Sequence, residues 1–296
     1  MEKVLKGTVT GLWRFPVKSM GGEQLEEAEL TEAGILGDRA YALIEKDTLK
    51  VVSAKSVKSF PDLFQFKAAF VEPPRKGCAL PPVLITFPDG NLLRSDSDDA
   101  DEVLSAHFGR AVTLGQTAPD DYTIDQYHSD IEGADPAGRK DEVVEQKLGA
   151  ALFTELGMES PVPAGSFFDV FPLSILTTSS LAQLKEHQPE SLFDERRFRM
   201  NVIVETEESG FIENNWIGQD LTLGEAVALK VAMPGPRCIM TILEQDDLPR
   251  DPAILKTLVN HNRIQVGDLG KFPCAGVYAV VMASGSVRLG DSVSLD

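Results

Sequence analysis

A single cysteine near the C-terminus has the residue type and the setting for metal chemistry. Cys238 lies in Met233-Pro-Gly-Pro-Arg-Cys238, directly after a strand-like run over 227–232. Thiolate is the side-chain donor that binds soft metals best, and Arg237, which is always charged, favours a thiolate or binds an anionic group. Because two prolines and a glycine cannot continue a ladder, we expect Cys238 on a turn just beyond the strand. The alternative is a buried structural thiol, which this segment alone favours.

Four further segments bring hydroxyl, amide and cationic groups to expected strand ends. They are Arg14–Ser19, Gly34–Arg39, Thr177–Ser180 and Arg196–Asn201. The first places Lys18 and Ser19 where Pro16 stops a ladder, which indicates a phosphate corner. The pattern of the second, taken alone, favours a hairpin with a solvent-facing Arg39.

The other two segments each have two interpretations. Thr177 and Thr178 lead into a helix N-terminus, where free N–H groups and hydroxyls hold an anion, and simple helix capping explains them equally well. The arginines before Asn201 indicate a buried anion or a surface ion-pair cluster. Cations from distant parts of the chain, most of them at strand ends, together predict a pocket for a phosphorylated ligand within reach of a thiolate. The residues behind that prediction are Lys18, Ser19, Arg39, Arg199 and Arg237.

Composition limits the class of protein. The chain has 296 residues, 43% apolar side chains and a formal net charge of −18, so it can bury a substantial core. The acidity argues against nucleic acid or an anionic membrane as the main partner, because both need clustered Lys and Arg. Three widely spaced cysteines, no signal-peptide pattern and no apolar run of membrane-spanning length predict a cytoplasmic protein without membrane contact.

Short strand-like runs predict a mainly β fold with helices (α+β). The first part is expected to contain strands at 4–14, 39–44, 83–87 and 111–114, and a helix from 98 or 99 to Gly109. Residues 117–138 are rich in Asp, Pro, Gly and Ser, which predicts a linker or a long surface loop. We therefore divide the chain into domains 1–125 and 126–296.

The second domain is expected to mix strands and short helices. Its expected elements are strands at 174–178 and 200–204, a helix capped by Ser179 or Ser180, a helix that opens at Pro252, and a closing hairpin of 277–282 with 287–295. The four histidines, His107, His128, His187 and His261, are scattered without zinc spacing, so we interpret them as surface or capping residues.

Taken in order, these motifs resemble those of the MOSC proteins, which include the C-terminal domain of molybdenum cofactor sulfurase and the amidoxime reducing component. Phe15–Ser19 and Gly37–Arg39 are similar to the family's N-terminal β-barrel domain. Phe198–Asn201, Arg237-Cys238 and the closing 287–291 are similar to the MOSC domain. The resemblance covers nearly the whole chain and implies a MOSC β-barrel domain preceded by a smaller β-barrel-like domain.

The resemblance also implies a cofactor, molybdenum held by molybdopterin. In the reductase branch, the residue that matches Cys238 ligates molybdenum, and the residues that match Lys18, Ser19, Arg39, Arg199 and Arg237 surround the pterin and its phosphate. Asn201 matches the asparagine of the family's Arg-Pro-Asn. Thr177 and Thr178 fall close to further contacts. Met200 stands where the family's Arg-Pro-Asn has proline. The implied cofactor-binding residues are Lys18, Ser19, Arg39, Thr177, Thr178, Arg199, Asn201 and Arg237.

Two functions of different classes follow from that resemblance. The first is a molybdenum-dependent oxidoreductase that reduces N-hydroxylated or other N-oxygenated compounds. Three cysteines cannot supply an iron–sulfur cluster set, so its electrons would come from a separate electron-transfer protein of the reductase, ferredoxin or cytochrome type. The alternative is a sulfur carrier or cofactor-delivery protein in which Cys238 holds a persulfide or the cofactor.

Overall fold

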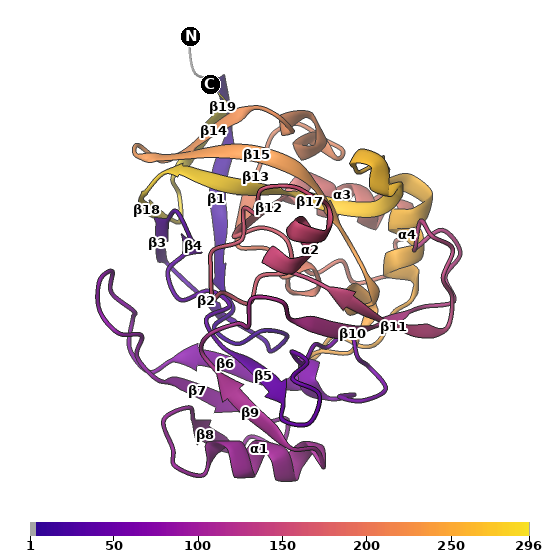
Figure 1. The fold of residues 1–296 in the computed structure, drawn as a ribbon. Coiled ribbons are helices and arrows are strands. Elements are labelled where there is room, and N and C mark those ends of the chain that lie inside the picture. The colour runs from indigo at the N-terminus through magenta and orange to yellow at the C-terminus, as the bar shows by residue number, and fades with distance from the viewer. Residues whose placement is uncertain (1–3, 296) are drawn as a thin grey trace.

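Seven strands form a closed barrel in the computed structural model, which describes residues 4–295. In the order of pairing they are β12 (Leu173–Thr177), β13 (Val202–Glu205), β1 (Val4–Arg14), β19 (Ser292–Leu295), β14 (Asp220–Leu223), β15 (Val227–Pro236) and β17 (Lys271–Ala283). β17 pairs back onto β12, so the ring has no free edge. Two short strands extend it, β2 (Glu23–Gln24) on β1 and β16 (Arg263–Gln265) on β17. The first and last described strands lie side by side (Figure 1).

Alternating apolar side chains fill the barrel. In β15, Val227, Leu229 and Val231 are buried, whereas Ala228 and Lys230 between them are half-buried. Successive residues of a strand face opposite sides of a sheet, which explains the alternation. Burying one such Val or Leu side chain contributes about 1.5–3 kcal/mol to stability.

Closure of the ring requires a glycine in β17. Gly276 has φ +71°, and a Cβ atom there would lie 2.4 Å from the Ile175 carbonyl oxygen of β12 and 2.2 Å from Met200 Cε. Only glycine tolerates both the left-handed backbone and the close approach. Gly276 therefore lets β17 come close enough to β12 and to Met200 for the barrel to close.

The chain between β1 and residue 115 forms small antiparallel sheets and one helix. The first sheet contains β3 (Glu27–Thr31), β4 (Gly34–Ile35) and β18 (Gly285–Arg288); the second contains β5 (Ala42–Glu45) and β9 (Val112–Gly115); the third contains β6 (Lys67–Phe70), β7 (Val83–Thr86) and β8 (Leu92–Arg94). Helix α1 (Ala100–Phe108) ends at Gly109, whose left-handed φ of 62° suits a helix C-terminus. Phe64, Phe66 and Leu104 are buried in the core that these elements share with η1 (Leu63–Gln65).

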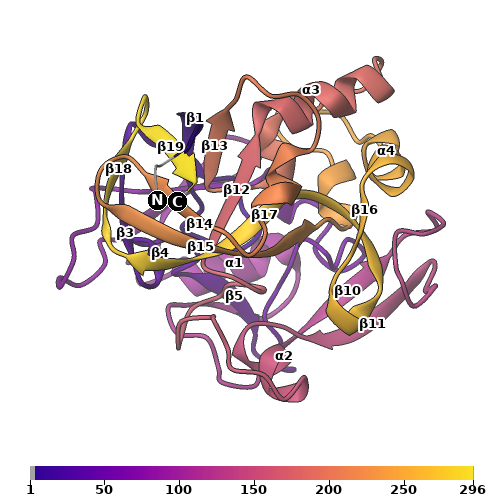
Figure 2. The same cartoon turned by 90° about the horizontal axis from the view of Figure 1, so that it is seen from above.

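A hairpin and three helices complete the described chain. The hairpin pairs β10 (Thr123–His128) with β11 (Glu142–Lys147) and lies between the barrel and the β5–β9 region (Figure 1). The helices are α2 (Ala150–Glu155), α3 (Thr178–His187) and α4 (Ala253–His261), and the 3₁₀ turns are η2 (Glu195–Phe198), η3 (Ile212–Trp216), η4 (Ile239–Ile242) and η5 (Gly267–Leu269). In Figure 2, α3 and α4 lie on one side of the barrel, away from α2. None of the helices within 4–295 is long and apolar enough to span a bilayer.

The predicted fold class is confirmed, because the described residues are mostly strands with four α-helices, a closed barrel and a β-rich N-terminal part. Three local predictions were wrong. Residues 117–138 are not one loop, because β10 pairs across to β11. The helix after β12 is capped by Thr177 rather than Ser179 or Ser180. β17 forms no hairpin with the segment after it, because β18 pairs with β3 and β19 pairs with β1 and β14.

The strand before Cys238 also continues further than expected. β15 runs through Pro234 and Pro236, with register shifts against β17 in this stretch. β14 pairs with β15 as far as Lys230, and Val231 still exchanges hydrogen bonds with Gly218 and Gln219. Pro234 and Pro236 come after this stretch and pair with β17, and prolines are tolerated at the edge of a sheet. The domain boundary near 117–138 stays a prediction.

Candidate functional site

One pocket of about 890 Å³ brings together most of the predicted site residues. Residues on both sides of the expected domain boundary line it. Its lining includes Lys18, Ser19, Arg39, Arg199, Asn201, Arg237 and Cys238. Segments that lie far apart in sequence thus meet at one place, as the distribution of cations predicts.

Positive charge predominates in the lining of this pocket, although the chain as a whole is acidic. Eight Lys or Arg and four Asp or Glu line it, whereas the full sequence has 28 and 46. The cations are Lys18, Arg39, Lys55, Arg139, Lys147, Arg197, Arg199 and Arg237, and the acids are Asp135, Glu145, Glu155 and Asp169. A local excess of one charge in a cleft concentrates ligands of the opposite charge.

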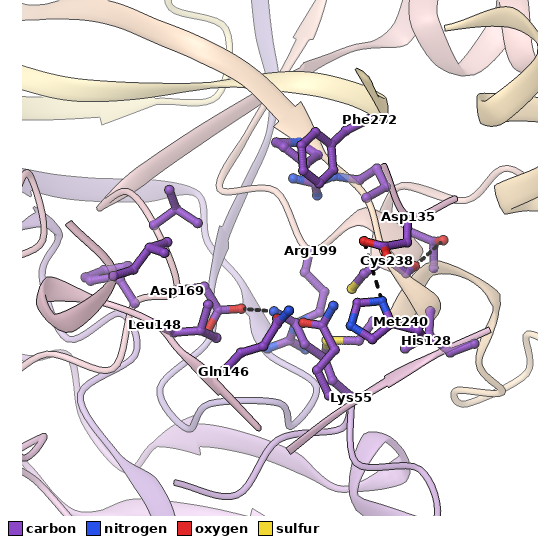
Figure 3. A pocket seen from close by; sticks show the side chains of 18 of the residues that line it. Lys55, His128, Asp135, Gln146, Leu148, Asp169, Arg199, Cys238, Met240 and Phe272 are labelled. Carbon is purple, nitrogen blue, oxygen red and sulfur yellow. Dashed lines mark hydrogen bonds and ion pairs between the residues drawn. The ribbon is translucent and has the colours of Figure 1, made fainter. Parts of the chain in front are cut away.

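Cys238 lies where the strand and the next turn meet. It directly precedes η4, and its carbonyl oxygen accepts hydrogen bonds from Thr241 N at 3.2 Å and from Thr241 Oγ1 at 3.0 Å. The thiol is free and half-buried. Figure 3 shows it among the side chains that line the pocket, with Arg199 and His128 drawn close by. The turn therefore fixes the backbone of Cys238 and leaves its sulfur facing the pocket.

A carboxylate and an amide hold Arg39. The buried Asp38 accepts from the Phe15 N–H at 2.7 Å and forms an ion pair with the Arg39 guanidinium. Asn201 Nδ2 donates to the same carboxylate at 2.9 Å and to the Trp13 carbonyl at 3.2 Å. Protein partners thus use the Asn201 side chain, which positions Asp38 and through it Arg39.

Replacing Asn201 tests that positioning network. We expect Asn201→Ala to lower the free energy of unfolding by about 1–3 kcal/mol, because the buried Asp38 and the Trp13 carbonyl lose a donor. Chemical denaturation measures this change. The matched control is Asn91→Ala, which removes an amide that hydrogen-bonds to Asp89 at an exposed turn. Equal stability of the two variants would contradict the network.

Arg39 and Arg199 lie on the same aromatic ring. Their guanidinium carbons are 4.5 Å and 4.3 Å from the centroid of Phe15, and Arg39 Nη2 donates to the Arg199 carbonyl at 3.1 Å. Burial, and then repulsion by Arg39, lowers the pKa of Arg199 to about 9. Cation–π contacts offset part of that repulsion. An anion bound between the two guanidinium groups would offset much more of their repulsion.

Strained backbone accompanies these residues. Ser19, Arg39 and Arg199 have φ of 69°, 48° and 54°, a left-handed conformation that is uncommon for residues other than glycine. Such strain collects at ligand sites, where the surrounding structure holds it in place. Ser19 Oγ also accepts from Ala54 N at 3.0 Å, which fixes the loop that carries Lys55.

Two lysines share one carboxylate at the pocket wall. Lys18 Nζ donates to the Phe167 carbonyl at 2.8 Å and pairs with Asp169, and Lys55 Nζ lies 2.7 Å from the other oxygen of Asp169. Burial acts to raise the pKa of Asp169, but the two ammonium groups outweigh it and hold that pKa well below its usual range. Burial lowers the pKa of Lys18. For Lys55, the attraction of Asp169 and then of Cys238 overcomes burial and raises the pKa.

Arg237 is held by the protein at each of its nitrogens. Nε donates to the Gly235 carbonyl at 3.0 Å, Nη1 to the Phe198 carbonyl at 2.9 Å, and Nη2 to the Tyr278 hydroxyl at 2.7 Å. The bond to Phe198 fixes the residue before Arg199. Arg237 therefore joins the Cys238 turn to the Arg199 segment.

Thr177 and Thr178 do not belong to the lining of this pocket. Thr177 Oγ1 accepts from Ser180 N at 3.2 Å and donates to the buried Glu213 carboxylate at 2.7 Å, and Thr178 begins α3. Thr177 thus caps a helix and anchors Glu213.

Several pocket residues were missed by the sequence interpretation. Lys55 and Asp169 occupy segments with no recognisable motif, and their pairing joins residues 114 positions apart. His128 was interpreted as a surface or capping residue, which was wrong, because it is only 6% exposed and lines the pocket. The apolar residues Tyr122 and Ile124, separated by the polar Thr123, were the available signal for a strand at this place.

Comparison with protein families agrees with this geometry. The profile of the MOSC N-terminal beta barrel domain matches residues 6–110, and that of the MOSC domain matches residues 146–294. The chain belongs to the MOSC family. This family is associated with binding of the molybdenum cofactor.

Curated relatives cover nearly the whole chain. Mitochondrial amidoxime reducing component 2 of Homo sapiens is 26% identical over 301 residues, which are 97% of this chain and 83% of the relative. Mitochondrial amidoxime-reducing component 1 of Homo sapiens is 26% identical over 312 residues, with coverages of 98% and 83%. A solved structure, the YUAD protein from Bacillus subtilis, aligns over 99% of this chain and 97% of its own with 12% identity and a TM-score of 0.45. The relatives are named mitochondrial, and the expected cytoplasmic location of this chain stays a prediction.

Proposed function

We propose that this MOSC protein is a molybdenum-cofactor-dependent reductase of N-hydroxylated compounds that receives electrons from a separate protein. The observation that carries the proposal is the excess of Lys and Arg over Asp and Glu around a free thiol in one pocket. The names of the relatives, amidoxime reducing components, support the substrate class.

The residues present fit the cofactor in charge, size and donor type. Lys18 forms an ion pair with Asp169, and Arg39 forms one with Asp38. A phosphate would add a counter-charge for these two groups and for Arg199, whose pKa is lowered by burial and by repulsion from Arg39. The volume of about 890 Å³ lies within the range of about 300–1,000 Å³ typical of ligand pockets. Cys238 offers the soft donor that a molybdenum centre takes.

Each group of residues would then have a distinct role. When bound, the cofactor supplies two-electron oxygen-removal chemistry at the metal. Cys238 would ligate the metal, and the guanidinium groups of Arg39 and Arg199 would bind the phosphate by charge-assisted hydrogen bonds. Asn201, whose amide donates to two protein oxygens, and Arg237, each of whose nitrogens donates to a protein partner, would position those groups rather than contact the ligand.

A reconstituted electron-transfer assay tests the function. Protein produced in a host that makes the molybdenum cofactor, supplied with NADH and a reductase chain, should convert benzamidoxime to benzamidine. The same protein from a host unable to make the cofactor is the control and should be inactive. Inactivity at full molybdenum loading with several donors and several N-hydroxylated substrates would contradict the proposal.

A further inference from the structure

His128 is a buried pocket residue with one unused ring nitrogen. It is the last residue of β10, is 6% exposed and lines the same pocket as Cys238. Within residues 4–295, its Nε2 is one of three buried side-chain nitrogen or oxygen atoms that have no hydrogen-bond partner, and the other two belong to residues outside the lining. An unpartnered buried polar atom costs about 1–3 kcal/mol. Such an atom in a ligand pocket indicates a partner on the ligand.

The opposite edge of the imidazole faces a fixed carboxylate. His128 Nδ1 lies 3.7 Å from Asp135 Oδ1. Arg139 holds that carboxylate on both oxygens, with Nε to Oδ2 at 2.8 Å and Nη2 to Oδ1 at 3.0 Å. Figure 3 draws the ring between Asp135 and the middle of the pocket, below Cys238. A carboxylate beside Nδ1 favours the tautomer with the proton on Nδ1, so Nε2 presents a lone pair to the pocket.

The surroundings keep this imidazole neutral. Burial, and then repulsion by Arg139, lowers the pKa of His128, and Lys55 acts in the same direction. Asp135 and Glu142 oppose these effects without overcoming them. The backbone also ties the histidine to the site, because Tyr127 N donates to the Lys55 carbonyl at 3.0 Å. A neutral ring is able both to accept a proton and to return it.

We infer that His128 is a catalytic residue that accepts the hydroxyl proton of an N–O–H substrate at Nε2 and returns a proton to the substrate nitrogen as the N–O bond breaks. The inference rests on the proposed reductase function. Overall, R–NH–OH, two electrons from the donor protein and two protons from solvent give R–NH2 and water, and His128 ends in its starting protonation state. Asp135 is a positioning residue that fixes the tautomer.

His128→Gln separates hydrogen bonding from proton transfer. Glutamine keeps a polar side chain but cannot relay a proton, so we expect kcat to fall about 100- to 10,000-fold while KM and molybdenum content stay near those of the wild type. Below the lowered pKa of His128, the wild type should lose kcat/KM as Nε2 becomes protonated, and the His128→Gln profile should be flat in that range. The matched control is His261→Gln, at an exposed histidine of α4. Wild-type kcat in molybdenum-loaded His128→Gln would overturn the inference while leaving the reductase function intact.

A readout without turnover distinguishes the two proposals. In cofactor-loaded protein with ¹⁵N-labelled histidine and no electron donor, benzamidoxime should shift the Nε2 resonance of His128 and leave that of His261 in place. Saturating benzamidoxime without a shift at His128 would overturn the inference, whether or not the protein turns over. If the reductase proposal itself is wrong, the molybdenum-loaded wild type will be inactive in the electron-transfer assay, which is a separate result.

Discussion

Replacing Cys238 by serine will give a folded protein that binds no molybdenum and reduces no amidoxime. The hydroxyl of serine is a harder and much weaker donor than thiolate for a soft metal centre. Removing a hydrogen-bond partner of a metal ligand lowers activity by up to about 100-fold. Removing the ligand itself should lower reductase activity by more than that. Metal analysis by mass spectrometry and the benzamidoxime assay measure the two effects.

The other two cysteines supply the controls for that experiment. Cys78 is exposed, so Cys78→Ser should keep wild-type molybdenum and activity. Cys274 is buried in β17, and burial raises the pKa of its thiol to about 12, so it is not a thiolate at neutral pH. Retention of molybdenum by Cys238→Ser, or its loss from Cys78→Ser, would contradict the assignment of Cys238 as the ligand.

Asp169→Asn will destabilise the protein through the two lysines that the carboxylate pairs. Removing one partner of a buried ion pair costs about 3–5 kcal/mol. The Asp169 side chain is 31% exposed, and solvent screens part of the interaction, so we expect the free energy of unfolding to fall by about 2 kcal/mol. Urea denaturation at pH 7 measures the change. Asp96→Asn, at an exposed carboxylate paired with Arg94, is the matched control and should stay close to wild type.

The difference in free energy of unfolding between the wild type and Asp169→Asn should change with pH in one direction. The pKa of Asp169 is lowered in the folded state, so its stabilisation is complete above the unfolded pKa of about 3.9 and is lost as pH falls toward the folded value. The difference between wild type and Asp169→Asn should therefore be constant from pH 8 to pH 5 and narrow below about pH 4. A difference that grew on acidification would contradict the assigned ion pairs.

Added phosphate gives a second test of the same cluster. In Asp169→Asn, Lys18 and Lys55 lack their counter-charge, so inorganic phosphate should raise the stability of this variant more than that of the wild type. Sodium chloride at equal ionic strength controls for general screening. Equal effects of the two salts would show that the lysines do not form an anion site.

The sequence predicted the local features of this site better than its long-range pairings. β1 has the predicted bounds, and Cys238 follows the end of a strand as expected. Both features depend on residues that are close together in the sequence. The position of cations at expected strand ends also predicted that Lys18, Arg39 and Arg199 lie in one pocket, and all three line it. In a chain with an excess of acidic residues, cations at several strand ends indicate an anion-binding site.

What the sequence interpretation missed depends on residues that meet only in the folded chain. The pairing of β18 with β3 joins segments more than 250 positions apart, and no local pattern distinguishes it from a hairpin with β17. Asp169 and Lys55 belong to segments without regular alternation, so the pairing of the carboxylate with both lysines could not be expected. The Asp and Gly residues on both sides of β10 led to the prediction of a loop there. The burial of His128, the last residue of β10, was missed for the same reason.

Molybdenum and pterin content of the wild-type protein tests the central claim most directly. Protein from a cofactor-producing host should contain near-stoichiometric molybdenum and pterin, and protein from a host unable to make the cofactor should contain neither. Intact-mass analysis of the same samples reports the state of the Cys238 sulfur. Absence of metal and pterin in both samples, with an additional sulfur atom on Cys238, would contradict the reductase and establish a sulfur carrier in its place.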